Sequence, residues 1–221
     1  MALPTYVYLI CPGASHRKIS CHLWIGRSTL RANSPQVSGI TNFFIMRIFS
    51  AACTAFEANT RDTVKALFRR GDPAARGQPA RTALIRQAGG WFGGTGRAPA
   101  VPRDSDVLTE ADLAAYTAAL ERNGFFGPDS WYMNDDRNIA YSAKAVDGGR
   151  LGMPVLFLHA ANDLICDTTA SRLAEPMRES CANLTEVVVQ SGHWMAQERP
   201  VTVNAALAKW LVMKLADIWP S

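Results

Sequence analysis

The last third of the chain alternates between strand-like and helix-like segments, and this alternation limits the folds open to it more than any other feature. Residues 155–158 form a continuous apolar run of the buried-strand type, and residues 186–189 are predicted as a second strand. A helix is predicted between them over residues 168–175, ending at Pro176, and an amphipathic helix over residues 203–215. This order favours parallel strands with right-handed crossovers, so we expect an α/β fold.

A carboxylate and an imidazole follow these two strands. Asp163 comes after the first strand and His193 after the second. Because the carboxyl ends of parallel strands meet at one edge of a sheet, we expect the two side chains to lie together. A carboxylate fixes one tautomer of a bonded imidazole, which can then take a proton near neutral pH. The pair therefore predicts two members of a catalytic triad, and no convincing nucleophile precedes it in the sequence.

Two competing interpretations concern the same residues. Asp167 is an alternative to Asp163, but it precedes Thr168 and a predicted helix, so we interpret it as an N-cap. His193 stands beside Trp194 and would also suit a buried structural position. An isolated Gly-His after a Val-rich strand, with an aspartate at the preceding strand end, favours the triad role.

Length, composition and charge exclude several function classes. A chain of 221 residues with 48% hydrophobic and 19% charged residues can bury a core of its own. The formal net charge of +4 is spread along the sequence without a basic stripe, so we expect no nucleic-acid partner. The apolar stretch over residues 2–10 is well short of the roughly 20 residues that a membrane span needs, so we expect no span.

Cysteine and histidine usage bears on compartment and cofactors. The five cysteines are odd in number and form no CxxC pair, which argues against a disulfide framework and a zinc cluster and favours a reducing, cytoplasmic setting. His159 lies inside an apolar run and is predicted to be a packed side chain, while His16 and His22 have no carboxylate partner nearby. We therefore expect neither a metal nor a cofactor.

The middle of the chain is predicted to be mainly helical. Apolar residues at three-to-four spacing predict a helix from Thr54 to a stop at Gly71. The sharpest local signal is a capping box at Thr109 and Asp112, which starts a helix that ends at Gly124. Another helix is predicted over residues 137–145, whereas the first 53 residues show no steady period.

Three motifs together are specific enough to indicate a family. They are Gly-Pro-Asp-Ser-Trp-Tyr-Met-Asn at 127–134, the apolar run from Pro154 with Asp163, and Gly-His-Trp at 192–194 followed by Glu-Arg-Pro at 198–200. In this order they resemble the lid and C-terminal half of the α/β-hydrolase-fold epoxide hydrolases, over about residues 52–219. The Trp-Tyr-x-Asn element is the most discriminating of them.

The resemblance implies an incomplete α/β-hydrolase fold of the α/β class. It divides the chain into an unassigned segment over residues 1–53, a helical lid over residues 54–150, and the last two parallel strands and helices of the core sheet over residues 151–221.

The resemblance also implies roles for individual residues and an epoxide-hydrolysing activity. Asp163 would orient His193, and His193 would activate water. Tyr132 would donate a hydrogen bond to the oxygen of a small apolar epoxide, because a phenol remains protonated at pH 7. Side chains expected to line the substrate pocket are Trp131, Trp194 and Phe126.

Some family features are not found. Neither the His-Gly-x-Pro oxyanion motif nor an aspartate nucleophile elbow is found in residues 1–53, and residues 42–49 contain no second lid tyrosine. Residues 145–149 match the elbow string around Asp147, but a helix is predicted before them, so we interpret Asp147 as a surface residue. We hypothesise that the chain lacks most of an N-terminal half and expect little or no turnover.

Two other functions stay open. The Asp-His pair is also compatible with a related hydrolase of esters or haloalkanes. Alternatively, the chain is a non-catalytic remnant that binds a small apolar ligand or a partner. Two strands with their helices would leave an open sheet edge and an uncovered apolar face, so we expect aggregation or the binding of a partner, for which a second copy of the chain is one candidate.

Overall fold

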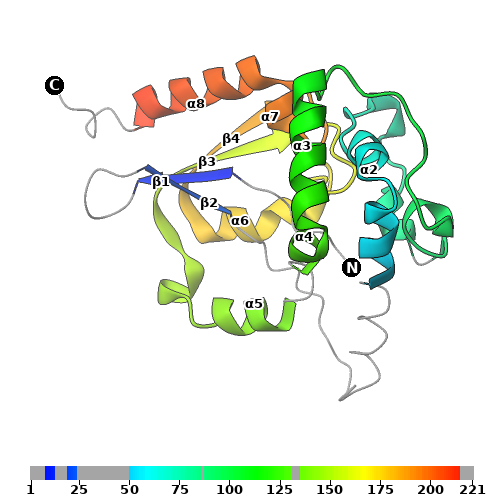
Figure 1. Cartoon of the computed structure of the whole chain (residues 1–221). Helices are drawn as coiled ribbons and strands as arrows, with labels where there is room; N and C mark the ends of the chain where they lie inside the picture. The colour runs from blue at the N-terminus through cyan, green and yellow to red at the C-terminus, as the bar shows by residue number, and fades with distance from the viewer. Residues whose placement is uncertain (1–7, 13–18, 24–49, 86, 131–134, 215–221) are drawn as a thin grey trace. The chain divides into compact units, whose positions relative to one another are not determined.

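The computed structural model describes residues 8–12, 19–23, 50–85, 87–130 and 135–214, which form two compact units (Figure 1). The first unit contains the described residues of 50–70 and 78–135. The second contains the two N-terminal strands, residues 71–77 and the chain from residue 136 onward. Trp131, Tyr132 and residues 42–49 lie outside the described residues.

The second unit is built on a parallel pair of strands. Strand β3 (Leu151–Ala160) pairs with β4 (Cys181–Val189), with Leu158 opposite Val187. The predicted parallel arrangement is confirmed, although both strands begin earlier than the apolar runs suggest. A separate antiparallel pair is formed by β1 (Tyr8–Pro12) and β2 (Ile19–Leu23).

Helices cover both faces of the β3–β4 pair (Figure 1). Because side chains alternate along a strand, Leu156 and Leu158 point to one face and pack with Val203 and Trp210 of α8 (Pro200–Lys214). On the other face, Val155 and Phe157 pack with Met177 of α6 (Glu175–Ser180). The predicted apolar stripe of the last helix is confirmed at 203, 207, 210 and 211, whereas position 215 lies outside the described residues.

The predicted helix over residues 168–175 is wrong. The segment contains only a 3-10 turn, η6 (Arg172–Ala174), and α6 starts at Glu175. Pro176 occupies the first turn of α6, where its missing N–H costs no hydrogen bond and its fixed φ suits a helix. The proline therefore starts a helix instead of ending one.

The first unit is helical, with one break that the periodicity did not show. Residues 50–57 are helical, and α2 (Thr60–Leu67) follows after a turn. Asn59 causes the break, because its side chain accepts a hydrogen bond from the Asp62 N–H and caps α2. Short 3-10 turns η2 (Arg81–Leu84) and η3 (Trp91–Gly94) lead toward the next helix.

The predicted capping box is confirmed in α3 (Glu110–Asn123). The Thr109 hydroxyl accepts from the Asp112 N–H, and the Asp112 carboxylate accepts from the Thr109 N–H. Gly124 ends the helix with φ +70°, a conformation that favours glycine. The short helix α4 (Phe126–Ser130) follows.

The remaining helices are α5 (Asp135–Ser142), η5 (Val146–Gly149), α7 (Met195–Glu198) and the turn η1 (Pro73–Ala75). Within the described residues, every helix is too short or too polar to cross a membrane.

Candidate active site

The loops after β3 and β4 bring Asp163 and His193 together. Backbone hydrogen bonds continue past both strand ends, from the Ala161 N–H to the Val189 carbonyl and from the Asn162 N–H to the Ser191 carbonyl. The two loops therefore run side by side beyond the sheet. Nδ1 of His193 lies 3.0 Å from Oδ2 of Asp163, so the two side chains share a hydrogen bond.

The Asp163 carboxylate is held firmly from its other side. Its Oδ1 atom accepts the backbone N–H groups of Ile165 at 2.9 Å and Cys166 at 3.0 Å, and its side chain is 9% exposed. An ionised carboxylate can only accept hydrogen bonds, so Nδ1 of His193 carries the proton. Nε2 is then the nitrogen with a lone pair, which is the arrangement that a general base requires.

Trp194 is the one predicted pocket residue that the structure places against the pair. Its ring centroid lies 5.2 Å from that of His193, with an edge-to-face angle of 81°. Phe126 belongs to the first unit and is 66% exposed. Trp131 and Tyr132 lie outside the described residues, so the structure places neither side chain.

Two residues that the sequence did not single out as functional, Glu198 and Arg76, contact the same two loops. Glu198 bonds the backbone of Gly192, and Arg76 bonds Asn162. Arg76 and Asn162 are distant in sequence, and Glu198 and Gly192 are separated by a turn. No local sequence pattern therefore predicts either contact. Glu198 belongs to the Glu-Arg-Pro motif of the family resemblance, but the motif does not show that this glutamate is buried and bonded to Gly192.

The three rejected candidates have ordinary structural explanations. His159 is buried and uses both ring nitrogens, contacting Thr168 Oγ1 and Glu186 Oε1 at 2.9 Å each, which agrees with a packed side chain. Asp147 is exposed in η5, after a helix and before β3, and this order is the reverse of the strand-to-helix turn of an elbow. Asp167 accepts from the N–H groups of Thr169 and Ala170, although no helix follows directly.

Asp163, Cys166 and His193 are also the one group of potential metal ligands among the described residues. Their ligand atoms lie within 4.8 Å of one another. The hydrogen bonds that Asp163 makes to His193 and to the Cys166 backbone account for this grouping without a metal.

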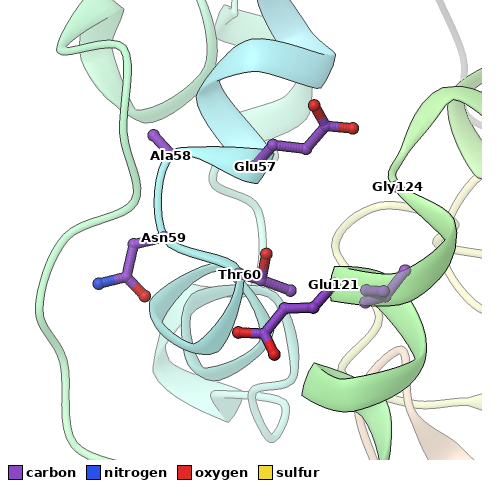
Figure 2. Close-up of a pocket in the computed structure, with 7 residues that line it drawn as sticks. Glu57, Ala58, Asn59, Thr60, Glu121 and Gly124 are labelled. Atoms are coloured by element: carbon purple, nitrogen blue, oxygen red, sulfur yellow. The ribbon is translucent and has the colours of Figure 1, made fainter.

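A surface pocket of about 560 Å³ lies in the first unit (Figure 2). Its lining includes two acidic side chains, Glu57 and Glu121, and the end of α3 at Gly124. Glu57 already accepts the Phe125 N–H at 2.9 Å. The lining contains neither member of the Asp163–His193 pair, and its polar, open character does not suit an apolar epoxide.

An unusual carboxyl lies elsewhere in the first unit. Burial, with a smaller contribution from the Glu57 charge, raises the pKa of Asp129 to about 6, although the hydrogen bond from Cys53 opposes this rise. The Cys53 thiol donates to Asp129 Oδ2 at 3.3 Å, and burial raises the pKa of that thiol to about 12.

Comparison with known proteins finds relatives that are named epoxide hydrolases. Bifunctional epoxide hydrolase 2 of Sus scrofa is 30% identical over 156 residues, which is 70% of this chain and 26% of that protein. Epoxide hydrolase A of Mycobacterium tuberculosis is 32% identical over 109 residues, covering 47% of this chain and 32% of that protein. No model of a protein family matches the sequence.

Solved structures show the same relationship. Epoxide Hydrolase A from Mycobacterium thermoresistibile superposes with a TM-score of 0.55 at 26% identity, over 80% of this chain and 57% of that one. A Vigna radiata epoxide hydrolase mutant gives a TM-score of 0.54 at 24% identity, over 77% and 53%, and shows the shared fold. The chain spans about half of these solved chains and about 26% of the Sus scrofa protein.

Proposed function

The chain is homologous to epoxide hydrolases of the α/β-hydrolase fold, and from this relationship we propose that it provides the water-activating part of an epoxide hydrolase site. The observation that carries the proposal is the hydrogen bond between His193 Nδ1 and Asp163 Oδ2. It fixes the tautomer in which Nε2 can take a proton from water.

The proposed reaction has two steps. In the first, Nε2 of His193 removes a proton from water while the water oxygen attacks an epoxide carbon, the ring C–O bond breaks, and the departing oxygen takes a proton from a phenol, which gives the diol. In the second, the imidazolium returns its proton to the phenolate, so that both groups regain their starting protonation states. Asp163 stabilises the imidazolium that forms in between.

We assign the phenol of the first step to Tyr132 and treat residues 54–150 as the lid that presents it. The support is the Trp-Tyr-x-Asn motif together with the homology. Trp194, which packs edge-on against His193, is proposed to wall the substrate site. Trp131 and Phe126 are proposed as the lid side of that wall.

The test compares substrates and variants in one assay. The purified chain is incubated at excess enzyme with an aryl epoxide, an activated aryl ester and a bromoalkane. Diol formation above the buffer rate supports the proposal, whereas ester or haloalkane turnover without diol supports a related hydrolase. His193→Ala should abolish every enzymatic rate. An absence of turnover of every substrate, with or without binding of the epoxide, would support the non-catalytic alternative and contradict the proposal.

Tyr132→Phe separates epoxide opening from ester hydrolysis. Loss of one hydrogen-bond donor to a developing oxyanion costs about 10²-fold in rate. The loss should affect the epoxide and spare the aryl ester, which needs no ring opening. Tyr141→Phe is the matched control, because Tyr141 is 81% exposed.

We further propose a cytoplasmic location, supported by the cysteine pattern, and self-association through exposed apolar residues. On α8 these include Val201, Val212 and Met213, which are 80%, 73% and 66% exposed. Sedimentation velocity at rising concentration should show a second copy binding. Val212→Lys should reduce that association, and a monomer over the whole concentration range would contradict it.

A further inference from the structure

Glu198 connects the loop that carries His193 to a distant part of the chain. It lies at the end of α7 and is only 6% exposed. One oxygen, Oε2, accepts the Gly192 N–H at 2.7 Å and the Gly71 N–H at 3.1 Å. Gly192 is the residue directly before His193. A buried carboxylate is tolerated only when hydrogen bonds compensate for its lost hydration. The N–H groups of Gly192 and Gly71 must therefore stay in place to stabilise Glu198.

Gly71 fits against both loops with no spare space. A Cβ atom added at Gly71 would lie 2.5 Å from Cα of Gly192 and 2.8 Å from Cβ of Asn162. These two neighbours directly precede His193 and Asp163 in the sequence. The backbone at Gly71 therefore lies close to the residue that precedes each member of the pair.

The other end of the same short segment holds the Asp163 loop. Nε of Arg76 donates to the Ala161 carbonyl at 3.1 Å and to Oδ1 of Asn162 at 3.0 Å. Residues 71–77 thus contact the His193 loop at one end, through Gly71 and Glu198, and the Asp163 loop at the other end, through Arg76.

We propose that Glu198 and Arg76 are positioning residues that, through residues 71–77, set the distance between Asp163 and His193. Neither residue is hydrogen-bonded to the Asp163 or His193 side chain, so neither takes part in the proton transfer itself. Their effect is on geometry, and a misplacement of about 1 Å in such a pair costs about 10²-fold in rate. The consequence for catalysis rests on the proposed function, whereas the consequence for the hydrogen bond does not.

The test measures the hydrogen bond directly. The Nδ1–H proton of His193 is followed by NMR in the full chain labelled with ¹⁵N-histidine, and His193→Gln identifies its signal. In the unsubstituted chain the proton should be protected from exchange with water. Glu198→Leu should raise its exchange rate about tenfold or more, because the Gly192 N–H loses its acceptor.

Conservative and control variants separate positioning from general stability. Glu198→Gln retains a carbonyl oxygen that can accept both N–H groups, so it should restore most of the protection. Glu179→Gln is the control, because Glu179 is an exposed glutamate on α6. Arg76→Ala changes an exposed side chain, so it should leave the fold intact while raising the exchange rate of the Nδ1–H proton. Arg76→Lys should restore little of the protection, because lysine lacks the planar donor group of arginine.

Unchanged exchange of the His193 Nδ1–H proton would overturn the positioning proposal. If Arg76→Ala leaves the Nδ1–H exchange rate unchanged, or if a folded Glu198→Leu does so, residues 71–77 do not position the pair. Fast exchange in these variants together with an absence of diol formation by the unsubstituted chain would support the positioning role and contradict the proposed function.

Discussion

Nδ1 of His193 lies 3.0 Å from Oδ2 of Asp163, and the same carboxylate is anchored by the backbone N–H groups of Ile165 and Cys166. Asp163→Asn should keep this geometry but remove the charge and allow the wrong histidine tautomer. We expect the low rate of diol formation to fall at least about tenfold, toward the buffer rate. Single-turnover kinetics measure the change, with the exposed Asp147→Asn as control. A loss smaller than about tenfold in the Asp163 variant would contradict the role.

Gly71→Ala should destabilise the second unit. The new methyl group would lie 2.5 Å from a backbone atom of Gly192, which cannot move like the end of a side chain. Overpacking of this kind costs about 1–3 kcal/mol. Urea unfolding measures the loss. Gly152→Ala is the matched control, because its Cβ would meet nothing within 4 Å and its change should be below about 0.5 kcal/mol.

Stability should fall as the pH rises through the titration of Asp129. Its pKa is raised from 3.8 to about 6 in the folded chain, mainly by burial. The folded state therefore favours the neutral acid, and the free energy of unfolding decreases between about pH 4 and pH 6. The decrease is at most about 3 kcal/mol and smaller after solvent screening.

Asp129→Asn removes this dependence. The variant should be more stable than the unsubstituted chain at pH 7 and equal to it near pH 4. Thermal unfolding at a series of pH values tests this, with Asp147→Asn again as control. A parallel pH dependence in the Asp129 variant and the unsubstituted chain would show that another group titrates.

The titration of Glu186 should change stability with pH in the opposite direction to that of Asp129. The Arg178 guanidinium, followed by the hydrogen bond from His159, lowers the pKa of Glu186 below its usual 4.5. This stabilisation is present above pH 4.5 and is lost as the pH falls through the lowered folded value. Glu186→Gln should reduce stability at pH 7 by about 1 kcal/mol, since the pair is partly exposed. Urea unfolding measures the loss of stability in Glu186→Gln beside that in Glu179→Gln. An equal loss in the two variants would contradict the predicted contribution of Glu186.

Much of the fold could be predicted because its signals are local. The apolar run around Leu156 and the capping box at Thr109 each specify their own element. The contact between Asp163 and His193 follows from topology alone, because the ends of adjacent parallel strands meet. The start of α6 at Glu175 was missed because a proline such as Pro176 occurs both after the end of a helix and in the first turn of one.

The supports of the site could not be predicted in this way. Glu198 and Gly71 are 127 positions apart, and nothing in the spacing of either residue reveals a shared hydrogen bond. The need for a glycine at 71 arises from the close approach of Gly192, which exists only after the chain has folded.

The most direct measurement is the rate of diol formation from an aryl epoxide at excess enzyme, compared between the unsubstituted chain and His193→Ala. We predict a low rate of diol formation, above the buffer rate, for the unsubstituted chain and a fall to the buffer rate in the variant. Equal rates for the two proteins, including an absence of diol from both, would contradict the claim that Asp163 and His193 activate water for this reaction.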